Sequence, residues 1–113
     1  MIEGYSFGSI QISGKRYTSD LVIGPAKIHT DWWRKKGHSL CLNDLKAIID
    51  WEQDVLVVGT GASGMMSIPS HLYSDLQSKG IKLEVAPTPE AIKKFNRYLE
   101  QGKKVVGAFH LTC

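Results

Sequence analysis

The sharpest chemical pattern in the sequence is a glycine-rich turn, Gly59–Gly64, with glycine at its first, third and sixth positions after an apolar run. This is the spacing of a dinucleotide-binding turn, in which backbone N–H groups meet a pyrophosphate at a helix N-terminus. Two features oppose that chemistry. Pro69 would break a helix that began in the turn, and Ala86-Pro87 follows the next strand, where a ribose-binding acid is expected. We therefore predict no cofactor, and a backbone-exposed, ligand-binding turn at Gly59-Thr60-Gly61.

A second cluster combines aromatic rings with cationic residues: Trp32-Trp33-Arg34, followed by Gly37-His38. Rings beside Arg and His can stack on an anionic ligand and match its charge. His38 is the acid–base candidate by residue type, because imidazole titrates near neutrality. The structural alternative is that one tryptophan fills the core and Arg34 covers it. Trp33, Arg34 and His38 are candidate ligand-binding residues, and no residue is assigned a catalytic role.

Two polar residues of the last expected helix extend this candidate site. Thr88-Pro89 is a helix start, with Thr88 as the cap. Asn96 lies in mid-helix beside the apolar stripe, where Asn is a poor helix former, so we expect it to bond a loop backbone. If the strands are parallel, Gly59-Thr60-Gly61 and the 86–88 loop lie at the same edge of the sheet. Thr88 and Asn96 are therefore further ligand-binding candidates.

The loop after the glycine turn is uncharged and contains Met65-Met66. Methionines in loops are typical of adaptable apolar contact surfaces, so both are candidate protein-contact residues. Ser63 does not stand in a nucleophile-elbow frame. The histidines and cysteines show no metal-ligand spacing, so we expect no metal.

Composition limits the function classes. The 113 residues fit one domain, 1–113, with a formal net charge of +3. The cations are dispersed, which disfavours nucleic acid as a partner and leaves a small anion open. The two cysteines, Cys41 and Cys113, are predicted to be free thiols in a reducing compartment. No signal-peptide pattern and no apolar run of about 20 residues is present, so we predict a cytoplasmic protein with no membrane partner.

The elements that must position these residues follow from periodicity and turn signals. An N-terminal β-hairpin turns at Ser13-Gly14, and Asn43 caps a short helix. From residue 54 onward, strands alternate with helices, which predicts βαβ units with right-handed crossovers. The expected ranges are a hairpin over 1–24, an irregular stretch over 26–42, a helix over 44–51, strands over 54–58, 81–85 and 104–111, and helices over 69–80 and 88–102.

Three motifs in order resemble a small domain-of-unknown-function family. They are Trp32–His38 with Asp44-Leu45, Val57–Gly61, and Thr88–Leu99 followed by Val105-Val106. The family includes the adipogenesis-associated domain-containing protein and a mitochondrial NADH:ubiquinone oxidoreductase assembly factor. The resemblance covers about residues 3–111 and implies a three-layer α/β fold with a mixed central sheet and the hairpin as an extra layer. Its better-known members are assembly or regulatory proteins.

Two functional hypotheses follow. The first is a non-enzymatic protein-binding or assembly module, which acts through a protein partner or as a homo-oligomer. The second is a small-molecule or anion site, catalytic or not, at Gly59-Thr60-Gly61 with Arg34 and His38.

Overall fold

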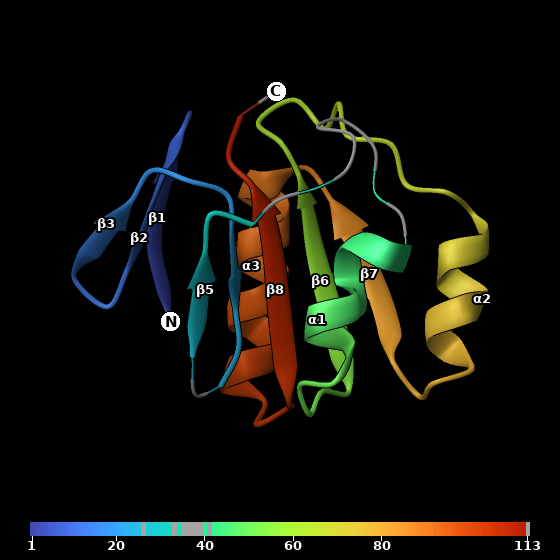
Figure 1. Cartoon of the computed structure of the whole chain (residues 1–113). Coiled ribbons are helices and arrows are strands. Elements are labelled where there is room, and N and C mark those ends of the chain that lie inside the picture. Colours follow the sequence, from blue (N-terminus) through green and yellow to red (C-terminus); the bar gives the residue numbers. More distant parts are fainter. Residues whose placement is uncertain (26, 33, 35–39, 41, 113) are drawn as a thin grey trace.

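A five-stranded mixed sheet forms the middle of the molecule, with strand order β5-β4-β8-β6-β7 (Figure 1). The strands β6, β7 and β8 are parallel to one another, whereas β4 pairs antiparallel with β8 and with β5. The computed structural model describes residues 1–25, 27–32, 34, 40 and 42–112, without the side chains of 42, 43 and 47. The strands of this sheet are β4 (Leu21–Ile23), β5 (Ile28–Thr30), β6 (Val55–Thr60), β7 (Lys82–Ala86) and β8 (Val105–His110).

The helices cover both faces of the sheet. A 3₁₀ turn, η1 (Leu42–Leu45), leads into α1 (Lys46–Ile49), and α2 (His71–Gln77) and α3 (Thr88–Glu100) connect the parallel strands. The chain passes from β6 to β7 on one side and then back to β8 on the other. Right-handed crossovers require α2 and α3 to lie on opposite faces after such a reversal. Their buried residues do belong to two different core clusters.

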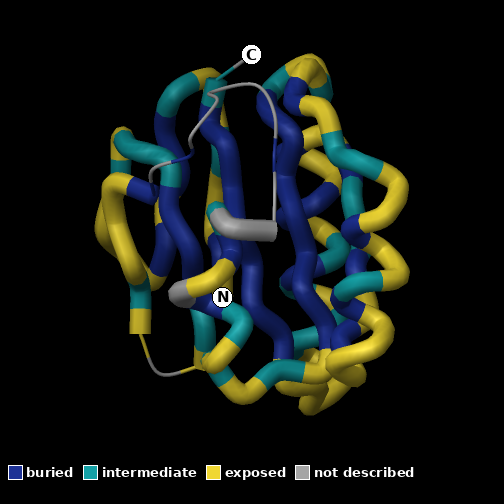
Figure 2. Tube along the Cα trace, turned by 45° about the vertical axis from the view of Figure 1, so that its right-hand side comes forward, coloured by how far each residue is buried: buried dark blue, intermediate teal, exposed yellow. Residues whose placement is uncertain are grey.

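The alternating side chains of the central strands supply both cores. In β6, Val55 and Val57 point to the α3 side, and Leu56 and Val58 point to the α1 and α2 side. All residues of β6 and β8 are buried (Figure 2). This confirms the prediction of a continuous apolar strand covered on both faces.

The N-terminal region differs from the predicted hairpin. It forms a separate antiparallel sheet of three strands, β1 (Ile2–Ser6), β2 (Ser9–Ile12) and β3 (Lys15–Tyr17). The Ser13-Gly14 turn is present, with positive φ at both residues. A second turn at Phe7-Gly8 divides the segment before Ser13-Gly14, which the hairpin prediction treats as one strand, into β1 and β2. The segment Leu21–Ile23, expected in the hairpin, pairs with β8 instead, because its three side chains are all buried in the main core.

Two further predictions from the sequence are wrong. The stretch expected to be irregular contains β5, an edge strand paired with β4. Thr88 is the first residue of α3 and not its cap, because Pro87 precedes the helix in an extended conformation. The predicted cap at Asn43 lies in η1, and its side chain is outside the described residues.

Helix α3 approaches β6 closely because Gly59 has no side chain. A Cβ at this position would lie 2.8 Å from Thr88 Oγ1 and 2.8 Å from a ring carbon of Phe109. Gly59 is also paired with Phe109 in the parallel register. The first turn of α3 therefore rests directly on the backbone of β6, beside the glycine-rich turn.

We expect Gly59→Ala to lower the free energy of unfolding by about 2 kcal/mol, because the added methyl group overpacks this contact. Gly4→Ala is the matched control, since a Cβ there meets nothing within 4 Å. Denaturant titration of both variants measures the difference. Equal stabilities for the two variants would contradict the close-approach role of Gly59.

Candidate functional site

The segment Gly59-Thr60-Gly61 lies at the carboxyl end of β6, between β7 and β8. Gly59 and Thr60, predicted to break the strand, are its last two residues, and the turn begins at Gly61. Because the chain leaves β6 for β7 and later returns to β8 on the opposite side, the topology reverses at this point. Ligands of open α/β sheets characteristically bind at such a reversal. The position predicted for the candidate site is therefore a topologically favourable one.

The Thr88 hydroxyl connects the turn to the end of β8. It donates a hydrogen bond to the carbonyl of His110 at 2.6 Å and accepts one from the N–H of Gly61 at 2.9 Å. The N–H of Thr88 also donates to the carbonyl of Gly61. The side chain is fully buried. Thr88 is thus a structural link between three segments, not a group presented to a ligand.

The backbone donors of the glycine-rich turn are also used inside the protein. In addition to Gly61, the N–H of Ala62 bonds the carbonyl of Thr112, that of Gly64 bonds Gly61, and that of Met66 bonds Thr60. A phosphate cradle needs such N–H groups directed at the ligand. The next helix, α2, begins only at His71. The geometry consequently lacks the helix N-terminus of a dinucleotide site.

A polar cluster lies at the same edge, formed by the buried side chains of Arg34 and His110 and the partly buried Asp20. Asp20 Oδ2 is 2.7 Å from Arg34 Nη2 and 2.7 Å from His110 Nδ1. Its other oxygen, Oδ1, accepts a hydrogen bond from the N–H of Leu111 at 2.8 Å. The carboxylate position fits a His110 tautomer that carries the proton on Nδ1. One carboxylate therefore joins the start of β4, the end of β8 and the segment of Arg34.

Arg34 covers a tryptophan, as in the structural alternative stated above. Trp32 is buried, and the Arg34 guanidinium lies 4.8 Å from the centre of its ring. The Trp32 indole N–H donates to the carbonyl of Asp44. Trp32 is therefore a core ring. Trp33 lies outside the described residues.

Competing effects act on the pKa of Asp20. Burial raises the pKa, but hydrogen bonds from Leu111, Arg34 and His110 and the charge of His110 outweigh it, so that the pKa lies below the ordinary value. Tyr5 lies close to this cluster and donates its hydroxyl hydrogen to the carbonyl of Leu111 at 2.7 Å. Burial and the nearby negative charge of Asp20 raise the pKa of Tyr5.

The structure separates the predicted candidates. Gly59, Thr60, Gly61 and Thr88 lie together. Arg34 Nη2 lies 3.0 Å from His110 Nδ1 in the adjoining strand. Asn96 lies elsewhere: its side chain exchanges two hydrogen bonds with the backbone of Ile2. It does bond backbone, as expected, but in strand β1, so it is no part of this site. His38 lies outside the described residues.

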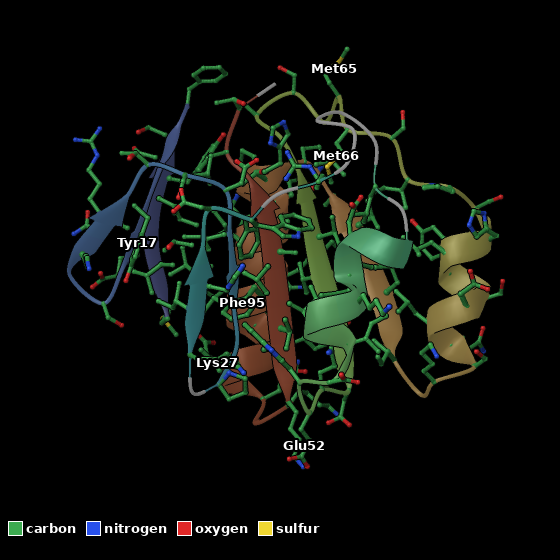
Figure 3. The ribbon with its side chains drawn as sticks, in the orientation of Figure 1. Tyr17, Lys27, Glu52, Met65, Met66 and Phe95 are labelled. Carbon is green, nitrogen blue, oxygen red and sulfur yellow. The ribbon has the colours of Figure 1, made fainter. Side chains whose placement is uncertain are left out.

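The two methionines also differ from each other. Met65 is 65% exposed, whereas Met66 is buried in the core on the α1 and α2 side (Figure 3). The prediction that Met66 is a protein-contact residue is therefore wrong. Its backbone N–H donates to the carbonyl of Thr60, and its side chain packs in the core. Met65 alone presents a surface.

Sequence reasoning missed Asp20 and His110 as partners. His110 was weighed only as a metal ligand, although it ends a parallel strand at the edge where functional groups gather. Asp20 immediately precedes β4, and the register Leu21↔Phe109 places it opposite His110. An acid before an antiparallel strand and a histidine at the end of its neighbour are signals that could have identified the pair.

The fold and this edge define the protein as a small α/β protein with a mixed sheet and a buried Asp–Arg–His cluster. Its sequence matches the model of a family described as protein of unknown function (DUF498/DUF598) over residues 2–110. The chain belongs to this family.

Solved structures agree with that assignment. The conserved hypothetical protein PH1505 from Pyrococcus horikoshii is 30% identical, with 100% of this chain and 99% of that chain covered and a TM-score of 0.79. The protein MT938 is 26% identical, with 100% of this chain and 98% of that chain covered and a TM-score of 0.81. An outer membrane protein from Bartonella henselae, 20% identical with coverage of 99% and 94% and a TM-score of 0.81, shares the fold. Among the described residues, no helix is long and apolar enough to cross a membrane.

We expect Asp20→Asn to destabilise the protein by about 3 kcal/mol at neutral pH, because it removes the carboxylate charge that pairs with the buried Arg34. The folded-state pKa of Asp20 is lowered, so its contribution is complete above the ordinary aspartate value of about 4. That contribution disappears as the pH falls through the folded-state value. The stability difference between wild type and variant should therefore shrink below about pH 4.

Unfolding free energies measured across this pH range test the prediction, with Asp75→Asn as the control, since Asp75 lies on the surface of α2. A wild-type advantage over Asp20→Asn that stays constant down to acid pH would contradict it.

We expect Thr88→Val, which keeps the shape of the side chain, to cost about 2 kcal/mol because the N–H of Gly61 and the carbonyl of His110 lose their buried partner. Thr18→Val, at an exposed position, should cost almost nothing. Thermal unfolding of both variants compares them. Equal thermal midpoints for the two variants would show that the Thr88 hydroxyl does not stabilise the contact between Gly61 and the end of β8.

Proposed function

We propose that this protein is a non-enzymatic protein-binding or assembly module and that it binds its partner through the surface at the carboxyl ends of β6 and β8. The observation that carries the proposal is the position of two exposed apolar side chains. Phe7 is 70% and Met65 is 65% exposed. Each stands on a turn that is hydrogen-bonded to the same short extension of β8.

Two backbone hydrogen bonds fix these turns. The N–H of Gly8 donates to the carbonyl of Leu111 at 2.9 Å, and the N–H of Ala62 donates to that of Thr112 at 3.3 Å. The ends of β1 and β8 and the loop after β6 all lie at the upper end of the molecule in Figure 1. Phe7 and Met65 therefore flank one strand extension on a rigid support.

The segments of the sequence that carry and support these two side chains are poor in charge. Residues 4–14, 55–74 and 105–113 contain no Asp, Glu, Lys or Arg, in a chain of which 22% is charged. Depletion of charge and enrichment in aromatic residues and Met are the compositional marks of the centre of a protein interface. The family resemblance to assembly and regulatory proteins supports the same function. That this chain is related to those particular members of the family stays a prediction.

The alternative of an anion site at Gly59-Thr60-Gly61 has less support. The Arg34 guanidinium is already 2.7 Å from the carboxylate of Asp20. The N–H of Gly61 is bonded to Thr88. An anion would have to displace an internal carboxylate or hydroxyl group, whereas a protein partner needs only the surface as it stands.

We expect a photo-crosslinking amino acid placed at position 7 or 65 to capture the same protein in cells that express the chain. The same probe at Tyr73, which is 44% exposed on α2, should not capture it. In pull-downs, Phe7→Ser and Met65→Ser should each reduce recovery of that protein at least tenfold, because truncation of an interface anchor commonly costs that much. Different proteins captured from positions 7 and 65, or equal capture from 73, would refute the proposal.

A further inference from the structure

The opposite end of the molecule has a hollow of about 420 Å³, and most of the side chains that line it are hydrophobic. It lies between the N-terminal sheet, helix α3 and the β4–β5 turn, far along the sheet from the Phe7 and Met65 surface. Small-molecule sites are typically apolar hollows of about 300–1,000 Å³ with few polar groups. The hydrophobic lining residues are Met1, Ile12, Ile23, Ile28, Phe95 and Leu99.

The floor of the hollow is part of the protein core. Ile12, Ile23 and Phe95 are buried members of the cluster on the α3 side, and Ile28 and Leu99 are partly buried against it. Phe95 is fixed by an edge-to-face contact with Phe109, with the ring centres 5.9 Å apart. An apolar ligand would therefore rest on side chains that are already held in place.

The Asn96 side chain fixes the far wall. Its amide accepts from the N–H of Ile2 at 3.0 Å and donates to the carbonyl of Ile2 at 2.8 Å. Ile2 is paired with Ile12 across β1 and β2. The small sheet is thereby attached to α3 at one strand, and the hollow remains between that strand and the β4–β5 turn.

The polar part of the lining includes the side chain of Lys27, which is labelled in Figure 3. Its ammonium group lies 4.4 Å from the centre of the Trp51 ring, and within the described residues it forms no ion pair. By contrast, Lys104, which lines the adjoining hollow with Lys27, is paired with Glu52. Lys27 therefore places a positive charge at the boundary between this hollow and the adjoining one, against the Trp51 ring of the adjoining hollow.

We propose that this hollow binds a medium-chain fatty acid, or another carboxylate with an unbranched alkyl tail. The carboxylate would pair with Lys27, and the tail would lie on Phe95 and Leu99. Charge complementarity selects the anion, since Lys27 is the charged residue of the lining. The apolar lining selects a tail without polar groups, because a buried polar group without a partner weakens binding.

The test is calorimetric titration of the whole chain with decanoate, octanoate and decylammonium, all below their micellar concentrations. Decanoate should bind about fifteenfold more tightly than octanoate, since each buried methylene strengthens binding about fourfold. Decylammonium, with the same tail and the opposite charge, should bind at least tenfold more weakly than decanoate. Absence of decanoate binding, or equal binding of the two decyl compounds, would overturn the proposal.

Two variants locate the site. Lys27→Gln should weaken decanoate binding about tenfold, whereas Lys79→Gln, an exposed lysine on the other face, should leave it unchanged. Leu99→Trp should fill the hollow and abolish binding while the thermal midpoint shows that the chain is folded. Decanoate-induced NMR shifts should gather at Ile28 and Leu99. Shifts that gather at Phe7 and Met65, or unaltered binding to Lys27→Gln, would assign the ligand to another place and refute this site.

Discussion

The carboxylate of Asp20 is the interaction on which the carboxyl edge of this sheet depends. It accepts hydrogen bonds from three directions: the backbone N–H of Leu111, the guanidinium of Arg34 and the imidazole of His110. These groups come from segments that are far apart in the chain, and β4 and β8 become neighbours where they meet. Burying a carboxylate even in part is costly unless it is paired, so the cluster is most stable when all three segments are in place. The lowered pKa of Asp20 records that the pairing outweighs the cost of burial.

The consequence of this arrangement is that the polar chemistry of the edge faces inward. The Thr88 hydroxyl, the N–H groups of the glycine-rich turn and the Asp20 cluster bond one another or the adjoining backbone. Among the residues that the structure describes at this edge, the uncharged turns carry the exposed apolar side chains of Phe7 and Met65. In many α/β proteins this sheet edge holds a ligand, whereas under the proposed function it would support an apolar contact surface. The opposite edge of the sheet, at the amino ends of the parallel strands, differs in that it has a hollow with Lys27 in its lining.

Much of the fold was predictable because local rules act strongly after residue 54. The unbroken run Val55–Val58 can only be a buried strand, and Pro89 and Gly102 delimit α3. The N-terminal part was predicted less well, because three-residue strands such as β4 and β5 acquire their partners through tertiary contacts with β8. The candidate site was found in part: the turn, Arg34 and Thr88 share one edge, as the parallel topology requires. The partner of Asn96 could not be placed from sequence, because a hydrogen bond over about ninety residues leaves no local pattern. Asp20 was missed for another reason, namely that the pairing of β4 with β8 was not predicted.

Amide hydrogen exchange in the Asp20→Asn protein tests the central claim most directly, namely that the Asp20 cluster supports the contact surface. If the cluster holds the β8 extension, and the extension holds both turns, exchange should accelerate together at Leu111, Gly8 and Ala62. The amide of Lys82 at the opposite end, which donates to the carbonyl of Asp54, should keep its protection. Faster exchange at Leu111 alone, with Gly8 and Ala62 unchanged, would show that the two turns are held independently of Asp20 and would contradict the account.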